Sequence, residues 1–246
     1  MIRLPWLDPD DPATFPPAEH ALRNPDGLLA AGGDLSMARL LAAYARGIFP
    51  WYSPGEPILW WSPDPRCVFD TARPHVSRRM DRWLAGSRWS ITADLAFDEV
   101  IDGCAAPRPG LPAGTWIVPE MRAAYGELHR AGFAHSIEVH GDAGLVGGLY
   151  GVALGKMFFG ESMFSRATNG SKVALLAMCR LLESHGFPLL DAQLVTPHLL
   201  RVGARAMPRG TFCAQVAQLV ERPCLEGSWA DLAFPRSAAE LRHTRG

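Results

Sequence analysis

The chain has 246 residues and a formal net charge of −1, with 48% hydrophobic and 20% charged residues. This balance is typical of a globular protein with one large domain, or one domain and a smaller one, and implies no global attraction to nucleic acid. No apolar run reaches the roughly 18 residues of a membrane span, and the first residues lack the apolar core of a signal peptide, so a cytoplasmic protein is expected.

The first 66 residues are rich in Pro, Gly and Trp and differ in pattern from the rest of the chain. One helix is expected here, with Ser36 as its N-cap, a body over 37–46, and Gly47 just after its end. The following stretch to residue 66 contains repeated prolines, which exclude long regular elements. Its aromatic residues are too many for so short a segment to cover, so some must pack on another domain or line a site.

Residues 67–246 alternate between helical and strand patterns, which predicts a second domain of the α/β (α+β) class. Capping and turn signals place helices at 76–86, 94–105, 119–132, 169–186, 196–203 and 211–222. Asp94 is the expected cap of the second of these helices, and a loop rich in Pro and Gly, expected to be mobile, follows it at 106–114. Strands are expected at 135–140, 144–154, 156–164 and 189–195, the first three as an antiparallel meander.

Two predicted strands carry polar groups inside apolar runs. Strict alternation places Phe159, Glu161 and Met163 on one face of their strand, and Asp191 and Gln193 on one face of another. A carboxylate among apolar neighbours is unfavourable by several kcal/mol unless it is paired or faces water. Glu161 is therefore either part of a structural salt bridge or part of a pocket wall on which these groups converge.

The common catalytic motifs are absent. The segment GESMF (160–164) has Phe where a nucleophile elbow needs Gly, and GVALGKM (151–157) lacks the spacing of a phosphate loop. There is no HExxH, and the five Cys lie far apart without a Cys-x-x-Cys pair, which disfavours a zinc site. We therefore expect no metal and no cofactor, and a site of acid, amide and aromatic groups suits a substrate that is already activated, such as an ester.

Residues 71–90 form the most basic segment of the chain. Asp81 is the only acidic residue among several Arg, and Trp83 and Trp89 interleave with them. Such a pattern suits an RNA backbone with base stacking, although a solvated helix face would look the same.

Seven segments of the chain resemble the leucyl/phenylalanyl-tRNA–protein transferase family, in the family's order, between about residues 15 and 215. The segments are FPPAEHALRNPDGLLAAGGDLS, RLLAAYARGIFPWYSPGEPILWWSPDPR, GTWIVPEMRAAYGELH, HSIEVH, LVGGLYGV, FFGESMFSR and LDAQLVTPHL. The resemblance implies a small N-terminal domain, at 1–66, joined to an acetyltransferase-like (GNAT) domain, at 67–246, with a mixed, largely antiparallel sheet. It also implies transfer of Leu or Phe, and Met less well, from aminoacyl-tRNA to proteins beginning with Arg or Lys, which marks them for N-end-rule degradation. A monomer is expected.

By the same resemblance, the adenosine- and amino-acid-binding aromatic residues fall on Trp51, Trp116 and Tyr125. The catalytic and substrate groups fall on Glu161, Asp191 and Gln193, and the apolar pocket for the amino acid on Leu149, Phe158 and Met163. The basic segment, through Arg73, Arg78, Arg79 and Arg82, is the expected tRNA-binding surface. The chain departs from its relatives at Leu149, where some have Met, in a longer loop at 105–114, and at Arg201 and Val202, where smaller residues are frequent.

The residues allow more than one assignment of roles in the reaction. Gln193 can orient the attacking amine but cannot act as a base, and Asp191 could polarise Gln193 or accept the proton through it. Glu161 could hold a ribose hydroxyl or the cationic residue of the acceptor. Two other classes compete with this interpretation: an acyl-CoA N-acyltransferase, disfavoured because SRATNGSK lacks the pyrophosphate-loop spacing, and a non-catalytic tRNA- or peptide-binding module.

Overall fold

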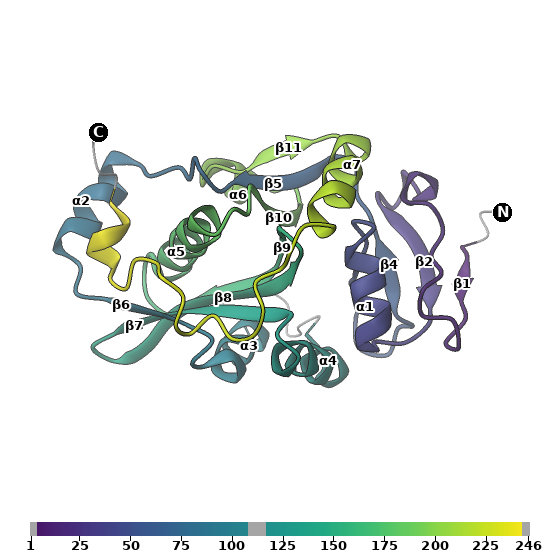
Figure 1. Ribbon diagram of the computed structural model, residues 1–246, viewed down its shortest axis with the longest axis horizontal. Coiled ribbons are helices and arrows are strands. Elements are labelled where there is room, and N and C mark those ends of the chain that lie inside the picture. The colour runs from purple at the N-terminus through teal and green to yellow at the C-terminus, as the bar shows by residue number, and fades with distance from the viewer. Residues whose placement is uncertain (1–3, 108–116, 243–246) are drawn as a thin grey trace.

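A computed structural model of the chain describes residues 4–107 and 117–242 (Figure 1). The N-terminal part forms a four-stranded sheet in the order β1-β2-β4-β3. Its strands are β1 (Trp6–Leu7), β2 (Leu28–Gly32), β3 (Phe49–Pro50) and β4 (Leu59–Trp61), accompanied by the short 3-10 helix η1 (Ala18–His20). The strands on either side of the Pro-rich stretch are short, as the proline spacing predicts.

The rest of the chain forms a seven-stranded sheet in the order β11-β5-β10-β9-β8-β7-β6. Only β9 and β10 run parallel, and every other neighbouring pair is antiparallel. This confirms the predicted fold class and the predicted meander. The strands are β5 (Arg66–Asp70), β6 (Ser90–Ala93), β7 (Ala134–Gly141), β8 (Gly144–Leu154), β9 (Met157–Ser165), β10 (Leu189–Leu194) and β11 (Arg205–Met207).

Helices lie on both faces of the larger sheet, the helix Met37–Tyr44 lies beside the N-terminal sheet, and a helix occurs at each predicted place. Ser36 acts as a side-chain N-cap, as expected from the sequence, and Ser77 and Thr196 cap their helices in the same way. Figure 1 shows α5 on one face and α3 and α4 on the other. The helices are α1 (Met37–Tyr44), α2 (Arg78–Gly86), α3 (Phe97–Ala105), α4 (Pro119–Arg130), α5 (Gly170–Ser184), α6 (Pro197–Arg201) and α7 (Arg209–Val220), with the 3-10 helix η2 (Ala238–Leu241) near the C-terminus.

Each face of the larger sheet has its own hydrophobic core. The core beneath α5 contains Leu149, Phe158 and most of the apolar face of that helix, and Met163 packs against it. The core on the other face continues into the N-terminal sheet and contains Tyr44, Tyr125 and Phe159. The N-terminal part therefore packs against the same face of the sheet as α3 and α4.

The division between the two sheets lies close to the predicted domain boundary at residues 66/67. The four-stranded sheet ends at Trp61, and β5 of the larger sheet begins at Arg66. The boundary itself, with domains at 1–66 and 67–246, remains a prediction. The loop expected at 106–114 lies largely outside the described residues.

The expectation that Asp94 caps α3 is wrong. The helix begins after Ala96 without a side-chain cap, and Asp94 adopts a left-handed backbone conformation with φ of 55°. Its carboxylate instead contacts the His135 ring at 2.8 Å and accepts hydrogen bonds from the backbone N–H groups of Ser136 at 2.8 Å and Trp229 at 2.7 Å. Those partners compete successfully with the helix end because together they satisfy both oxygens of a buried carboxylate.

Trp229 belongs to the segment after α7, for which the sequence suggested no role. Its ring stacks on His135 with centroids 3.8 Å apart and is fully buried. We call Asp94, His135 and Trp229 the tail network, because together they fasten the C-terminal segment to β7.

Candidate active site

The two parallel strands of the larger sheet separate where the predicted polar groups lie. β9 and β10 pair only from Met157–Phe159 against Leu189–Asp191. Just beyond, each strand contains a β-bulge: Glu161 is the extra residue of β9 against β8, and Ala192 is the extra residue of β10 against β5. Bulges increase strand twist and end regular pairing, so the strands diverge here. We call this divergence, at 160–163 and 192–195, the fork.

The bulge at Glu161 overturns the predicted alternation along β9. Phe159 and Met163 were expected on one face, but Phe159 packs in the core beside the tyrosines while Met163 packs against the core beneath α5. One extra residue reverses the facing of every side chain that follows it. As a result, Phe158 and Met163 share a face, which strict alternation excludes.

Glu161 lies at the fork with neutral partners. Tyr125 donates its hydroxyl hydrogen bond to Oε2 at 2.7 Å, and the amide nitrogen of Gln193 donates to Oε1 at 2.9 Å. The hydroxyl of Tyr44, from α1, lies 2.6 Å from that of Tyr125. No ion pair of Glu161 occurs within residues 4–107 and 117–242, so the structural salt bridge considered for it is not found there.

Burial gives Glu161 unusual acid–base properties. The side chain is only 7% exposed, and burial raises the pKa of its carboxyl group to about 7, against the opposing effect of the tyrosine hydrogen bonds. Burial and the charge of Glu161 also raise the pKa values of Tyr125 and Tyr150 far above the ordinary value. Both tyrosines therefore stay protonated and Tyr125 remains a hydrogen-bond donor to Glu161, whose own pKa lies near neutral pH.

Gln193 is held in an unusual backbone conformation beside Glu161. Its φ is 62°, in the left-handed region, which is rare for a residue with a side chain. Its backbone N–H donates to Asp191 Oδ1 at 2.9 Å, across the bulge at Ala192. Because its amide nitrogen already faces Glu161, the amide oxygen of Gln193 is left for another donor.

Asp191 is fully buried and paired with Arg66, a residue that the sequence analysis did not select. Arg66 Nε and Nη2 donate to the two carboxylate oxygens at 2.9 and 2.7 Å, and Nη1 donates to the Gly47 carbonyl at 2.8 Å. The guanidinium lies 4.8 Å from the Phe49 ring centroid and 4.5 Å from that of Phe212. A single Arg at the start of the apolar run CVF was the available signal in the sequence.

The predicted aromatic residues lie in different surroundings. Trp51 is 38% exposed, and its ring centroid lies 5.4 Å from that of Trp61. The Trp61 indole N–H donates to the Trp51 carbonyl at 2.6 Å. Tyr125 is fully buried with its hydroxyl on Glu161, and Trp116 lies outside the described residues.

The residues expected for the apolar pocket lie together in the core beneath α5. Leu149 and Met163 are direct partners in the pairing of β8 with β9. Leu149 and Phe158 are buried there and Met163 is half-buried. The structure thus joins Glu161, Gln193 and Tyr125 at the fork, and joins Leu149, Phe158 and Met163 on the opposite face of the sheet.

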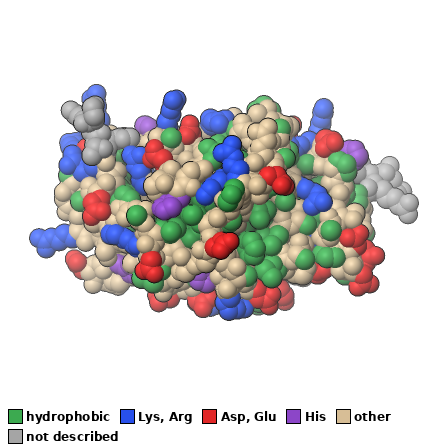
Figure 2. Space-filling view, in the orientation of Figure 1, with side chains coloured by type: hydrophobic (Ala, Val, Ile, Leu, Met, Phe, Trp, Pro, Cys, Tyr) green, Lys and Arg blue, Asp and Glu red, His purple; other side chains and the backbone are tan. Residues whose placement is uncertain are grey.

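The predicted RNA-binding arginines are distant from the N-terminal sheet. Arg78, Arg79 and Arg82 are exposed on α2, and Arg73 is exposed in the loop before it. Figure 2 shows basic side chains projecting at the end of the molecule where Figure 1 places α2. Asp81, the acidic residue of this segment, pairs with Arg242 at 3.3 Å, so the helix surface remains strongly basic.

Among the described residues, no three or more His, Cys, Asp or Glu side chains gather as metal ligands. In the same part of the chain, every helix is too short or too polar to cross a bilayer.

The sequence of the chain matches one family of known proteins along most of its length. Residues 68–217 match the family described as leucyl/phenylalanyl-tRNA protein transferase, and residues 33–64 match the N-terminal domain of the same family. A leucyl/phenylalanyl-tRNA–protein transferase of Xanthomonas axonopodis pv. citri is 55% identical over 98% of both chains. One from Xanthomonas euvesicatoria pv. vesicatoria is 58% identical over 95% of this chain and 93% of its own. One from Azoarcus sp. is 56% identical over 91% and 92%. The acyl-CoA-dependent alternative has no support among these relatives.

Proposed function

The chain belongs to the leucyl/phenylalanyl-tRNA protein transferase family and is an aminoacyltransferase, and from this premise we propose its substrates and the roles of its residues. Leu or Phe, and Met less well, passes from aminoacyl-tRNA to the N-terminal α-amine of proteins that begin with Arg or Lys. The protein acts in the cytoplasm as a monomer, and its products are marked for N-end-rule degradation.

The observation that supports this proposal most directly is the contact between Glu161 and Gln193 at the fork. In the reaction, the amine nitrogen forms a bond to the ester carbonyl carbon, and the bond from that carbon to the ribose oxygen breaks. The amine must lose a proton and the ribose oxygen must gain one. With a pKa of about 7, Glu161 is suited to take up the first proton and return it to the ribose oxygen.

Gln193 orients the attacking amine. Its amide nitrogen is engaged by Glu161, so its oxygen accepts a hydrogen bond from the amine and directs the nitrogen lone pair toward the ester. An α-amine has a pKa near ~8, so roughly a tenth of it is neutral at pH 7 and little base strength is required. Placement therefore supplies most of the rate enhancement.

Asp191 and Arg66 act as positioning residues. The carboxylate of Asp191 faces the backbone N–H of Gln193 and the guanidinium of Arg66, which favours a supporting role for it over a role in proton transfer. Asp191 holds Gln193 in its left-handed conformation, and Arg66 neutralises the buried charge that does so.

The remaining site residues bind the donor. Trp51 and Trp116 stack on the terminal adenine, which is worth about 1–3 kcal/mol per base, and Tyr125 holds Glu161 in place. The side chain of the transferred amino acid enters the core beneath α5 at Leu149, Phe158 and Met163. Such a pocket separates similar apolar side chains by only about 10–200-fold, so Leu and Phe are both accepted.

One assay tests the proposed reaction against its alternatives. The protein is mixed with labelled leucyl-tRNA, acetyl-CoA and a peptide beginning with Arg. The expected product is the leucyl peptide, and an otherwise identical peptide beginning with Glu remains unmodified. An acetylated product, or no product, would reject the assignment, and comparable transfer from valyl-tRNA would reject the described pocket.

A second measurement tests Gln193 and Asp191. The variants Gln193→Ala and Asp191→Ala are expected to lower turnover by about 100-fold while changing the affinity for aminoacyl-tRNA much less, since their roles concern the acceptor amine. Equal losses in turnover and affinity would contradict these roles.

A further inference from the structure

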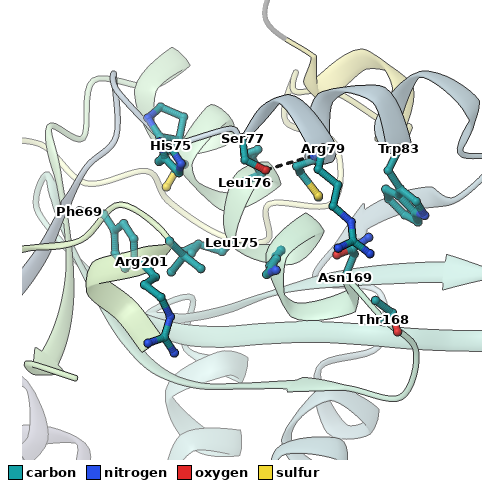
Figure 3. A pocket seen from close by; sticks show the side chains of 15 residues that line it. Phe69, His75, Ser77, Arg79, Trp83, Thr168, Asn169, Leu175, Leu176 and Arg201 are labelled. Carbon is teal, nitrogen blue, oxygen red and sulfur yellow. Dashed lines mark hydrogen bonds between the residues drawn. The ribbon is translucent and has the colours of Figure 1, made fainter. Parts of the chain in front are cut away.

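A cavity of about 390 Å³ lies away from the fork, between α2, the start of α5 and the end of α6 (Figure 3). This volume is within the range of small-ligand sites. Its floor is apolar and includes Phe69, Leu175 and Leu176. The cavity is therefore a candidate binding site, and of its lining residues only Arg79, an expected tRNA-binding residue, already has a role.

Three cationic side chains from three separate helices surround this cavity. Arg79 comes from α2, Lys172 from α5 and Arg201 from α6, and no Asp or Glu lines the cavity. Figure 3 shows Arg79 on one side, Arg201 on the other, and Leu175 between them. Throughout residues 4–107 and 117–242, none of the three has a carboxylate within ion-pair distance.

The three cationic side chains and the apolar floor together indicate which kind of ligand the cavity can bind. Cations without a carboxylate partner attract an anion, and Arg in particular binds phosphate oxygens in a fork-like geometry. An apolar floor that includes an aromatic ring suits a flat organic group beside that anion. A nucleotide carries both groups in one unit, a phosphate and a base.

The chain connects this cavity directly to the fork. β9, which carries Glu161, leads into Thr168 and Asn169 at the cavity and then into α5. β10, which carries Gln193, leads into α6 and Arg201. Thr168 follows Glu161 by seven residues, so the backbone path between them is at most ~25 Å. A few nucleotides of a single strand can cover such a distance.

We propose that this cavity binds a phosphate-bearing nucleotide of the acceptor arm of aminoacyl-tRNA, upstream of the aminoacylated adenosine. Arg79, Lys172 and Arg201 contact the phosphate, and the base lies against Phe69 and Leu175. This inference rests on the proposed function, because it takes its ligand from the proposed donor. It adds Lys172 and Arg201, which lie outside the basic segment, to the RNA-binding surface.

The test compares two RNA probes with adenosine. An uncharged acceptor-stem minihelix ending in CCA, the trinucleotide CCA, and adenosine are titrated against the wild type and against the double variant Lys172→Ala/Arg201→Ala. We expect about fivefold weaker minihelix binding for each charge removed, because exposed charge pairs contribute little more, and no change for adenosine. The slope of log affinity against log salt should fall by about 0.7 for each phosphate of a single strand that the variant no longer neutralises.

The variant Arg222→Ala is the matched control, since it removes an exposed charge just after α7 and outside the cavity lining. It should bind all three probes as the wild type does. The proposal is overturned if the double variant binds the minihelix and the trinucleotide normally, or if it loses adenosine equally. It is also overturned if coenzyme A binds more tightly than the minihelix in a manner that depends on Lys172 and Arg201.

The binding experiment separates this inference from the proposed function. A wild-type protein that binds the minihelix through Lys172 and Arg201 yet transfers no Leu would support the cavity assignment and reject the transfer reaction. Transfer of Leu together with minihelix binding that the two substitutions do not change would support the transfer reaction and reject the cavity assignment.

Discussion

Two of the polar networks at the seven-stranded sheet, the tail network and the fork, differ in one respect. The tail network has Asp94, whose φ is 55°, and the fork has Gln193, whose φ is 62°, so both depend on a left-handed residue with a side chain. Burial pushes the pKa of Asp94 upward, but the His135 hydrogen bond and charge, with the amides of Trp229 and Ser136, lower it overall. Glu161 at the fork has only neutral donors, and its pKa is raised to about 7.

This contrast gives a physical criterion that distinguishes a structural carboxylate from the proposed catalytic one. Asp94 has the His135 ring and two backbone donors, so its charged form is stabilised by the fold. Glu161 is buried without a counter-ion among the described residues, so its charged form is costly, and Gln193 beside it is only half-buried. The cation that could have paired with Glu161 is instead committed to Asp191.

The largest expected effect comes from removing that cation. Arg66→Ala leaves the Asp191 charge buried without its partner, and we expect a loss of about 3–5 kcal/mol in the free energy of unfolding, measured by denaturant titration. The double variant Arg66→Met/Asp191→Leu should be closer to the wild type in stability but about 100-fold slower in turnover, as expected for Asp191→Ala, because the backbone N–H of Gln193 loses its carboxylate partner. If the double variant is less stable than Arg66→Ala, the pair is not acting as described.

The next effect should separate the two networks. Asp94→Asn loses charge-assisted hydrogen bonds, and we expect about 2 kcal/mol of lost stability with normal turnover per folded molecule. Glu161→Gln keeps the size of its side chain and removes a costly charge, so at pH 8 its stability should equal or exceed that of the wild type, while turnover falls at least tenfold. Unfolding and transfer assays on both variants check that Asp94→Asn loses stability but not activity and that Glu161→Gln loses activity but not stability. Similar losses of activity in both variants would remove the distinction.

The smallest effect is the pH dependence. If Glu161 is the base in its charged form, as proposed, kcat/KM below about pH 7 should fall about tenfold per pH unit beyond the fall that the acceptor amine alone produces. Glu161→Gln should lose this inflection and keep only the one from the acceptor amine. A wild-type profile with no inflection near 7 would contradict the role of Glu161.

Stability should respond to pH with opposite signs in the two networks. The pKa of Glu161 is higher in the folded protein than in the unfolded chain. Its contribution to the free energy of unfolding is therefore fully present below pH 4.5 and is lost as the pH rises toward about 7 and above. The pKa of Asp94 is lower in the folded protein than in the unfolded chain. Its contribution to the free energy of unfolding is therefore present above pH 3.8 and is lost as the pH falls through the pKa of the folded state.

The sequence predicts the helices and the meander well because their signals are local. Caps such as Ser77 and Thr196 act within a few residues of their position. Glu161 and Gln193 stood out because a polar group inside an apolar run has few structural explanations. Asp94 misled because an acid just before an apolar run looks like a cap, whereas its real partners are 41 or more positions along the chain.

The rest depends on strand pairing and on distant contacts. A bulge is defined by the partner strand, so the reversal of facing at Glu161 has no signature in β9 alone. Arg66 pairs with a residue 125 positions away. Arg79, Lys172 and Arg201 come to line one cavity only when three helices pack together. Charges that converge from separate segments leave no pattern within any one of those segments.

The environment of Arg66 limits how this molecule can be divided or recombined in evolution. Its guanidinium is held by Gly47 and Phe49 from the N-terminal sheet region and by Phe212 from α7. An ancestor that exchanged its N-terminal portion for an unrelated module would have kept Glu161, Gln193 and Asp191 yet lost the contacts that support Arg66, the counter-ion of Asp191. The two portions are therefore linked at the site through Arg66, as they are through the contact of Tyr44 with Tyr125.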